Sequence, residues 1–245
     1  GPRGRVRLHL VRAGNDLGRV VEKIPRHGHR GDVNEQSPSA VVVLVHGLWF
    51  GPWSLGLLAR RLRRAGFEAR RFRYRSTRAD LAEHARALRQ FVGSPAGRPL
   101  HFVAHSLGGL VTLRMLAEAA DLPTGRVVLL GSPLGGSVAA RKSAGLPGAA
   151  RLLGAARPAL QNGFARLVAD RDIGMIAGSR SIGLGLFLGG LGEPGDGTVA
   201  VAETRSDGLR EHRLLPVTHT GMLFSRQVAR DVVHFLRAGR FDPSP

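Results

Sequence analysis

Residues 99–116 read PLHFVAHSLGGLVTLRML, and this stretch decides the fold. A short apolar run, Leu100–Ala104, is followed by His105 and Ser106, and a helical pattern then starts at once. When a strand turns so directly into a helix, the two backbones nearly touch, and the positions two before and two after the corner serine must be small. Ala104 and Gly108 hold these positions, although the usual motif has glycine at both. The stretch therefore predicts a nucleophile elbow rather than a plain turn.

Buried strands and amphipathic helices alternate along the chain around this corner. The runs at 41–45 and 127–130 are continuously apolar, which is typical of strands buried on both faces of a parallel sheet. The rhythm predicts an α/β fold with a mostly parallel central sheet flanked by helices. We expect further strands at 6–10, 67–74, 173–177, 198–202 and 212–216, and helices at 54–65, 81–92 and 222–236.

One stretch departs from that alternation. Residues 137–170 have a helical pattern rich in Ala, Gly, Leu and Arg, interrupted by prolines. We interpret it as a short helical cap inserted over the site, the alternative being an amphipathic surface layer. Because no repeat and no second core is visible, residues 1–245 are predicted to form a single domain.

The chain carries a net charge of +18, almost entirely from arginine. The arginine content reflects either a GC-rich genome or attraction to an anionic lipid surface, an acidic acyl carrier or nucleic acid. Nucleic acid is the least suited of these partners, because the few aromatic residues are not interleaved with the basic runs. The absence of cysteine excludes disulfides, thiolate metal sites and cysteine nucleophiles.

No targeting or membrane-spanning segment stands out in the sequence. No apolar run reaches the roughly 18–20 residues that cross a bilayer, and no signal peptide is visible. These features favour a cytoplasmic location. The chain opens with Gly1 and Pro2 instead of methionine, which is consistent with a trimmed N-terminal segment.

A serine hydroxyl attacks an acyl group only when an imidazole takes its proton and a carboxylate orients that imidazole. His219 falls between the last expected strand and the closing helix, where such a base must lie. The acid must precede it in the chain. We select Asp196, in the turn Pro-Gly-Asp-Gly-Thr-Val, with Glu193 as the reserve.

A tetrahedral intermediate also needs two backbone N–H donors. Leu107, directly after the nucleophile, offers one, at a helix N-terminus that favours negative charge. Leu48, in the loop after the strand at 41–45, is the simplest source of the other. Trp49 and Phe50 follow in the same loop, and they either line an acyl pocket or seal the core.

Several pieces of the chain together resemble the α/β-hydrolase superfamily, most closely bacterial triacylglycerol lipases and the related PGAP1-like esterases. One of them, Gly131–Ser137, is similar to the Gly-Thr-Pro-His-x-Gly-Ser segment of those lipases. The resemblance implies Ser106 as nucleophile, Asp196 and His219 as its partners, and Leu48 and Leu107 as oxyanion donors. The pieces that carry it are His46-Gly47, Ala104–Gly109, Gly131–Ser137, Gly195–Val199 and His219.

The sequence thus predicts a serine hydrolase that cleaves carboxylic esters of acyl or lipid substrates through an acyl-enzyme. An acyltransferase or an acyl-thioesterase would use the same residues, and a basic surface would suit its acyl carrier. A non-catalytic basic binding protein is the alternative from another class. No cofactor and no metal ion are expected.

Overall fold

The computed structural model describes residues 39–94, 97–119, 121–143, 148–164, 171–182 and 194–243. Contacts divide the chain into two units, Gly1–Gln36 and Ser37–Pro245, and every described residue belongs to the second. The strand expected at 6–10 lies outside the described residues.

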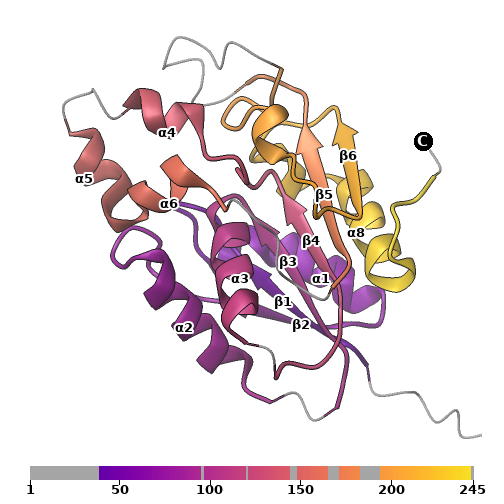
Figure 1. Ribbon diagram of the computed structural model, residues 1–245. Helices are drawn as coiled ribbons and strands as arrows, with labels where there is room; N and C mark the ends of the chain where they lie inside the picture. The colour runs from indigo at the N-terminus through magenta and orange to yellow at the C-terminus, as the bar shows by residue number, and fades with distance from the viewer. Residues whose placement is uncertain are drawn as a thin grey trace, which may run out of the picture. The chain divides into compact units, whose positions relative to one another are not determined.

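A six-stranded sheet with the strand order β2-β1-β3-β4-β5-β6 forms the centre of the second unit (Figure 1). All five neighbouring pairs are parallel, as the continuous apolar runs predict. The four inner strands are buried along their whole length, whereas the two edge strands are only partly buried. The strands are β1 (Val41–Val45), β2 (Glu68–Phe72), β3 (Leu100–His105), β4 (Val127–Leu130), β5 (Ile173–Gly178) and β6 (Glu211–Leu215).

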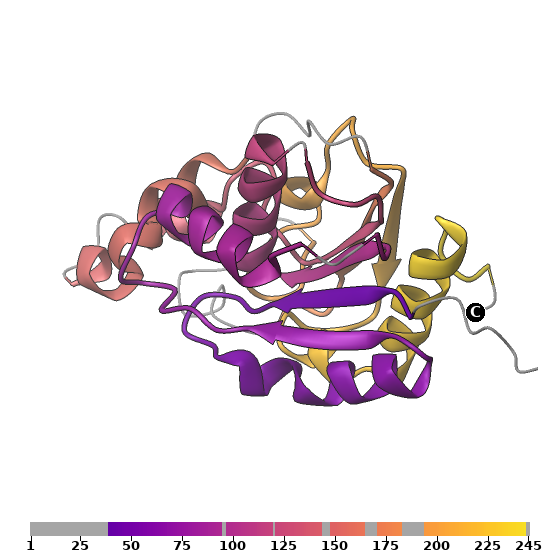
Figure 2. The ribbon, with the colours of Figure 1, turned by 90° about the horizontal axis from the view of Figure 1, so that it is seen from below.

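Helices cover both faces of this sheet (Figure 2). Side chains alternate along a strand, so Val41, Val43 and Val45 pack into one core with α2 (Leu81–Val92) and α3 (Leu107–Glu118). Val42 and Leu44 pack into the other core, with α1 (Gly56–Arg64) and α8 (Arg226–Ala238). The α2 helix starts as its sequence predicts, because Asp80 accepts a 2.8 Å hydrogen bond from the Glu83 N–H.

Three short helices and a 3₁₀ turn follow β4 and form the α4–α6 segment, residues 138–162. It comprises α4 (Val138–Ser143), α5 (Ala149–Leu153), η2 (Gly154–Ala156) and α6 (Arg157–Asn162). The segment lies against the loop that follows β2, where the Ala155 N–H donates to the Thr77 carbonyl at 3.0 Å. Leu153, Ala156 and Leu160 extend the core on this side. Its role as a cap stays a prediction.

Three expected elements differ in the structure. The helix expected at 54–65 opens with a 3₁₀ turn, η1 (Pro52–Leu55), before α1. The strand expected at 198–202 is wrong: this stretch forms a turn with a single antiparallel bridge between Gly195 and Ala200, followed by η3 (Ala202–Thr204). Side chains bind the amides that a strand would pair, as Asp196 accepts from the Val199 N–H at 2.8 Å.

The helix expected at 222–236 begins later: the 3₁₀ turn η4 (Gly221–Leu223) ends before the extended N-cap Ser225, and α8 begins at Arg226. In the described part of the chain, no helix is both long enough and apolar enough to span a bilayer.

Candidate active site

Ser106 occupies a strained corner between β3 and α3. Its backbone has φ of 54° and ψ of −125°, and only one other non-glycine residue in the described ranges, Trp49, has a positive φ. A Cβ atom on Gly108 would lie 2.5 Å from the carbonyl oxygens of both Val45 and His46, so no residue larger than glycine fits there. The fully buried Ala104 shows that one methyl is accommodated on the strand side. The geometry is the elbow that the sequence predicts.

Asp196 and His219 form a buried hydrogen-bonded pair. The Nδ1 of His219 lies 2.6 Å from Oδ2 of Asp196, and the His219 N–H donates to the Asp196 carbonyl at 2.9 Å. The other carboxylate oxygen of Asp196 accepts from the amides of Thr198 and Val199 at 2.9 and 2.8 Å. Because the carboxylate accepts, the proton of a neutral His219 resides on Nδ1, which leaves Nε2 unprotonated.

The carboxyl ends of the inner strands bring this pair to the elbow. A Cβ atom on Gly131, which follows β4, would lie 2.9 Å from Asp196 Oδ2 and 3.1 Å from His219 Nδ1. The ring of His105, the residue before Ser106, lies 4.5 Å from the His219 ring between centroids. His105 Nε2 also lies 3.0 Å from the His219 carbonyl oxygen. The structure therefore gathers Ser106, Asp196 and His219 at one edge of the sheet.

The loop after β1 passes beside the serine. A Cβ atom on Gly47 would lie 3.0 Å from the Ser106 Cβ, so this loop is in van der Waals contact with the elbow. The Trp49 N–H donates to Ser76 Oγ at 3.0 Å, whereas the described residues provide no acceptor for the Leu48 N–H. Leu107 is the first residue of α3, so its N–H has no partner within the helix.

The two aromatic residues of that loop lie on different sides. Phe50 contacts the His105 ring edge-on, with centroids 5.8 Å apart, and is half-buried beside the elbow. Trp49 is 44% exposed, and its indole N–H donates to the Leu152 carbonyl of α5 at 2.9 Å. Trp49 therefore does not seal the core, and it connects the loop to the α4–α6 segment.

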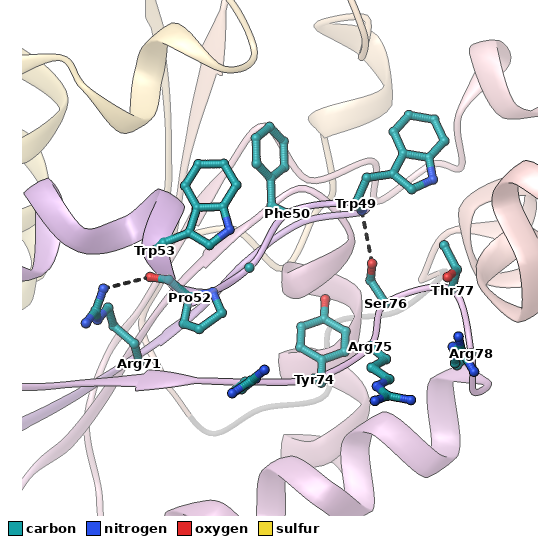
Figure 3. Close-up of a pocket in the computed structure, with 12 residues that line it drawn as sticks. Trp49, Phe50, Pro52, Trp53, Arg71, Tyr74, Arg75, Ser76, Thr77 and Arg78 are labelled. Carbon is teal, nitrogen blue, oxygen red and sulfur yellow. Dashed lines mark hydrogen bonds between the residues drawn. The ribbon is translucent and has the colours of Figure 1, made fainter.

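A groove of about 640 Å³ opens beside this loop (Figure 3). Two segments line it: residues 49–53, and residue 71 with residues 73–78 after β2. Figure 3 shows Trp49, Phe50 and Trp53 along one side, and Arg71, Tyr74, Arg75 and Arg78 along the other. The groove lining does not include Ser106, Asp196 or His219.

Tyr74 also contributes to the site. Its hydroxyl donates to the His46 carbonyl at 2.7 Å, and its ring stacks on that of His46 at 4.4 Å, so it supports the loop from below. Burial raises the pKa of Tyr74, which keeps the hydroxyl protonated as a donor. No sequence motif marks this tyrosine, because its role depends on β2 lying next to β1.

Glu203 is one of the acids that precede His219 in the sequence, and it has a supporting role in the structure. One oxygen accepts from the Ala200 N–H at 2.9 Å, and the other accepts from the Val138 N–H of α4. The side chain thus joins the Asp196 turn to the α4–α6 segment. Burial raises the pKa of Glu203. Glu193, the reserve acid, lies outside the described residues.

His105 is fully buried directly beside the candidate nucleophile. Burial lowers the pKa of His105 well below its usual value, and the neighbouring charge of His219 lowers it further. A neutral ring donates to the His219 carbonyl through Nε2, so Nδ1 carries no proton. Within the described ranges, no three His, Asp or Glu side chains converge in a way that could hold a metal ion.

Comparisons with known proteins agree with this architecture. The model of the alpha/beta hydrolase family matches residues 42–239. A search of curated proteins finds no significant match. The mature form of lipase BlEst2 from Bacillus licheniformis is similar in structure, with a TM-score of 0.66 and 20% identity over 86% of this chain and 96% of that one.

Two further solved structures are similar at comparable levels. The metagenomic carboxyl esterase MGS0156 has a TM-score of 0.60 and 19% identity, over 86% of this chain and 71% of that one. Phospholipase PlaB from Legionella pneumophila, solved in complex with thio-NAD, has a TM-score of 0.61 and 16% identity, over 80% of this chain and 56% of that one. At these identities the likeness establishes the fold. Because the family model spans most of the sequence and the structure has the corresponding parallel sheet and elbow, the chain belongs to the alpha/beta hydrolase family.

Proposed function

We propose that the protein is a serine hydrolase of carboxylic esters, with Ser106 as nucleophile, His219 as general base and Asp196 as the carboxylate that orients the base. The observation that carries this proposal is the 2.6 Å contact between His219 Nδ1 and Asp196 Oδ2 at the same sheet edge as the strained Ser106. The similarity in fold to lipases and esterases supports an acyl or lipid ester as the substrate.

In this mechanism the Ser106 Oγ attacks the carbonyl carbon of the ester, and its proton passes to His219 Nε2. The oxyanion accepts hydrogen bonds from the backbone N–H groups of Leu48 and Leu107. The assignment of Leu48 rather than its neighbour is supported by the Trp49 N–H, which is already bound to Ser76. His219 then protonates the leaving alcohol, and an acyl-enzyme remains on Ser106.

Water completes the cycle. His219 Nε2 takes a proton from the water molecule as it attacks the acyl carbonyl, and the second tetrahedral intermediate expels Ser106. His219 returns the proton to the serine oxygen, and the carboxylic acid leaves. Asp196 stays ionised throughout and stabilises the imidazolium that forms in each half-reaction.

The test compares wild type with Ser106→Ala on p-nitrophenyl esters of increasing acyl length. We expect wild type to hydrolyse them with a chain-length optimum, and Ser106→Ala to lose essentially all of the turnover above background. Ser132→Ala is a matched control, because Ser132 is also a buried serine, located just beyond the end of β4. Retained hydrolysis in Ser106→Ala, or an equal loss in Ser132→Ala, would contradict the proposal.

The same acyl-enzyme could be consumed by an acceptor other than water. Hydrolysis in the presence of added alcohols or thiols measures this partition directly. Release of free acid as the main product supports a hydrolase, whereas transfer of most acyl groups to the added acceptor identifies an acyltransferase with the same nucleophile.

A further inference from the structure

The groove beside the elbow combines arginine side chains with aromatic walls. Arg71, Arg73, Arg75 and Arg78 all line it, and none of its lining residues is acidic. Arg73, Arg75 and Arg78 are exposed and form no ion pair with any residue that the structure describes. Four guanidinium groups from one short segment therefore leave an uncompensated positive charge along one side of the groove.

Some arginines outside the groove are paired, as Arg98 is with Glu68, but others, such as Arg60 and Arg64 of α1, also form no ion pair with any residue in the described ranges. The groove is distinctive because its four arginines line the same hollow as the aromatic side chains. A guanidinium presents several N–H donors in a planar fork, which suits the oxygens of a phosphate. The hydroxyls of Ser76 and Thr77 lie in the same segment and border the same groove.

Two residues that line the groove contact the immediate surroundings of the proposed nucleophile. Phe50 lines the groove, and its ring contacts His105, the residue before Ser106. Tyr74 also lines it and donates to the His46 carbonyl, next to the loop that touches Ser106.

The arginine side is held in place from two directions. Ser76 accepts from the Trp49 N–H, and Thr77 accepts from the Ala155 N–H of the α4–α6 segment. A ligand in the groove would therefore contact a segment that hydrogen bonds hold in place, close to the proposed nucleophile. With a volume of about 640 Å³, the groove can hold a headgroup much larger than a phosphate ion.

We propose that this groove binds a phosphate group on the ester substrate, so that the enzyme selects acyl esters whose alcohol half is phosphorylated. The inference rests on the proposed ester hydrolysis, and it adds a substrate class that the hydrolysis does not require. The arginines bind the phosphate, the indole and phenyl rings cover the carbon skeleton of the headgroup, and the ester carbonyl reaches Ser106 past Phe50.

Binding can be measured without turnover. Trp49 and Trp53 are the only tryptophans of the chain and both line the groove, so intrinsic fluorescence reports its occupancy. Ser106→Ala is titrated with 1-hexanoylglycerol 3-phosphate and with 1-hexanoylglycerol, which differ only in the phosphate. We expect the phosphate ester to bind at least about tenfold more tightly, with an advantage that shrinks as salt is added.

Substitution of single arginines tests whether the preference for the phosphate ester comes from the groove. Added to Ser106→Ala, Arg75→Gln and Arg78→Gln should each weaken binding of the phosphate ester about fivefold and leave binding of the neutral ester unchanged. Arg64→Gln is the matched control, because Arg64 is also exposed but lies at the far end of α1, outside the groove. Equal binding of the two esters, or an equal loss in Arg64→Gln, would overturn the proposal.

Two further measurements separate the possible sources of the phosphate and distinguish the groove from the proposed activity. Inorganic phosphate should compete with the phosphate ester, and anionic vesicles should not be needed for the discrimination. A preference seen only with esters presented in vesicles would mean that the arginines bind a membrane surface, and it would overturn the proposed phosphate binding in the groove.

The titration and the hydrolysis assay can also fail separately. If no ester is hydrolysed but the titration still distinguishes the two esters, phosphate binding in the groove is supported and the proposed activity fails. Hydrolysis with equal binding of the two esters would instead support the activity and overturn the proposed phosphate binding.

Discussion

His105 Nε2 lies 3.0 Å from the backbone carbonyl oxygen of His219, so the residue before the proposed nucleophile supports the loop of the proposed base. The contact joins the end of β3 to the loop after β6, 114 residues further along the chain. His105 does not touch the reacting atoms by itself, and we regard it as a positioning residue. Its contribution is a fixed distance between the serine and the imidazole.

His105→Phe should keep the ring volume and remove the donor. The buried His219 carbonyl would then lack its partner, which costs about 1–3 kcal/mol of the free energy of unfolding. Displacement of His219 should lower kcat roughly 10–100-fold while KM changes little. His105→Gln, which can still donate an N–H, should recover part of kcat. A loss of stability in His105→Phe with unchanged kcat would show that the contact is structural only.

Asp196→Asn tests the orientation of the base. The amide would keep an oxygen for the Thr198 and Val199 N–H groups but would direct its NH₂ at His219 Nδ1. His219 would then carry its proton on Nε2 and could not accept one from Ser106. We expect kcat to fall about 10³–10⁴-fold with little change in thermal stability, measured on a p-nitrophenyl ester.

Asp172→Asn provides the control for that substitution. Asp172 is a partly exposed carboxylate that pairs with Arg126 and Arg210 ahead of β5, at the opposite edge of the sheet. Its loss should leave kcat within about twofold of wild type, because surface ion pairs contribute little. If both aspartate variants lose activity equally, the acid at position 196 has no special role.

The inner strands and the elbow could be predicted from the sequence because their physical constraints are local. The runs in β1, β3 and β4 are buried at every position, and a strand-to-helix corner needs small residues at fixed offsets from Ser106. The Asp196–His219 pair could also be predicted, because both loops must leave the sheet at the same edge. The 2.6 Å contact confirms their proximity and leaves their catalytic roles as a proposal.

The arginine groove could not be predicted in the same way. Its two sides are residues 49–53 and residue 71 with residues 73–78, and they meet only because β2 pairs with β1 rather than with another strand. The pattern of residues in β2 shows that it is a strand but does not identify its neighbour. The expected strand at 198–202 failed for a related reason, since carboxylates of Asp196 and Glu203 bind its amides.

Gly108→Ala should destabilise the fold severely. The new Cβ would lie 2.5 Å from two backbone carbonyl oxygens, which cannot move without displacing β1. We expect a loss of about 3 kcal/mol in the free energy of unfolding, measured by urea denaturation. Gly135→Ala is the control, because its Cβ would find its nearest neighbours at 3.7 Å, an ordinary contact. Equal stability of the two variants would contradict the elbow packing.

Acid should destabilise the protein through His101. Burial, with the nearby charges of Arg126 and Arg171, lowers the pKa of His101 to about 4, and its Nδ1 accepts the Arg126 N–H at 2.8 Å. In the unfolded chain the pKa of histidine is about 6.5. Between these values the unfolded state binds a proton that the folded state does not, so stability falls as pH drops below about 6.5 and is unaffected above it.

The size of this effect is at most about 3 kcal/mol between pH values of about 6.5 and 4, since each pKa unit corresponds to roughly 1.4 kcal/mol. His101→Asn retains an acceptor for the Arg126 N–H but cannot be protonated in this range. Urea unfolding at a series of pH values should therefore show a shallower decline for His101→Asn than for wild type, with the two curves diverging only below a pH of about 6.5. Parallel curves across the whole range would mean that His101 does not couple folding to pH, and that the acid sensitivity comes from other buried histidines such as His105.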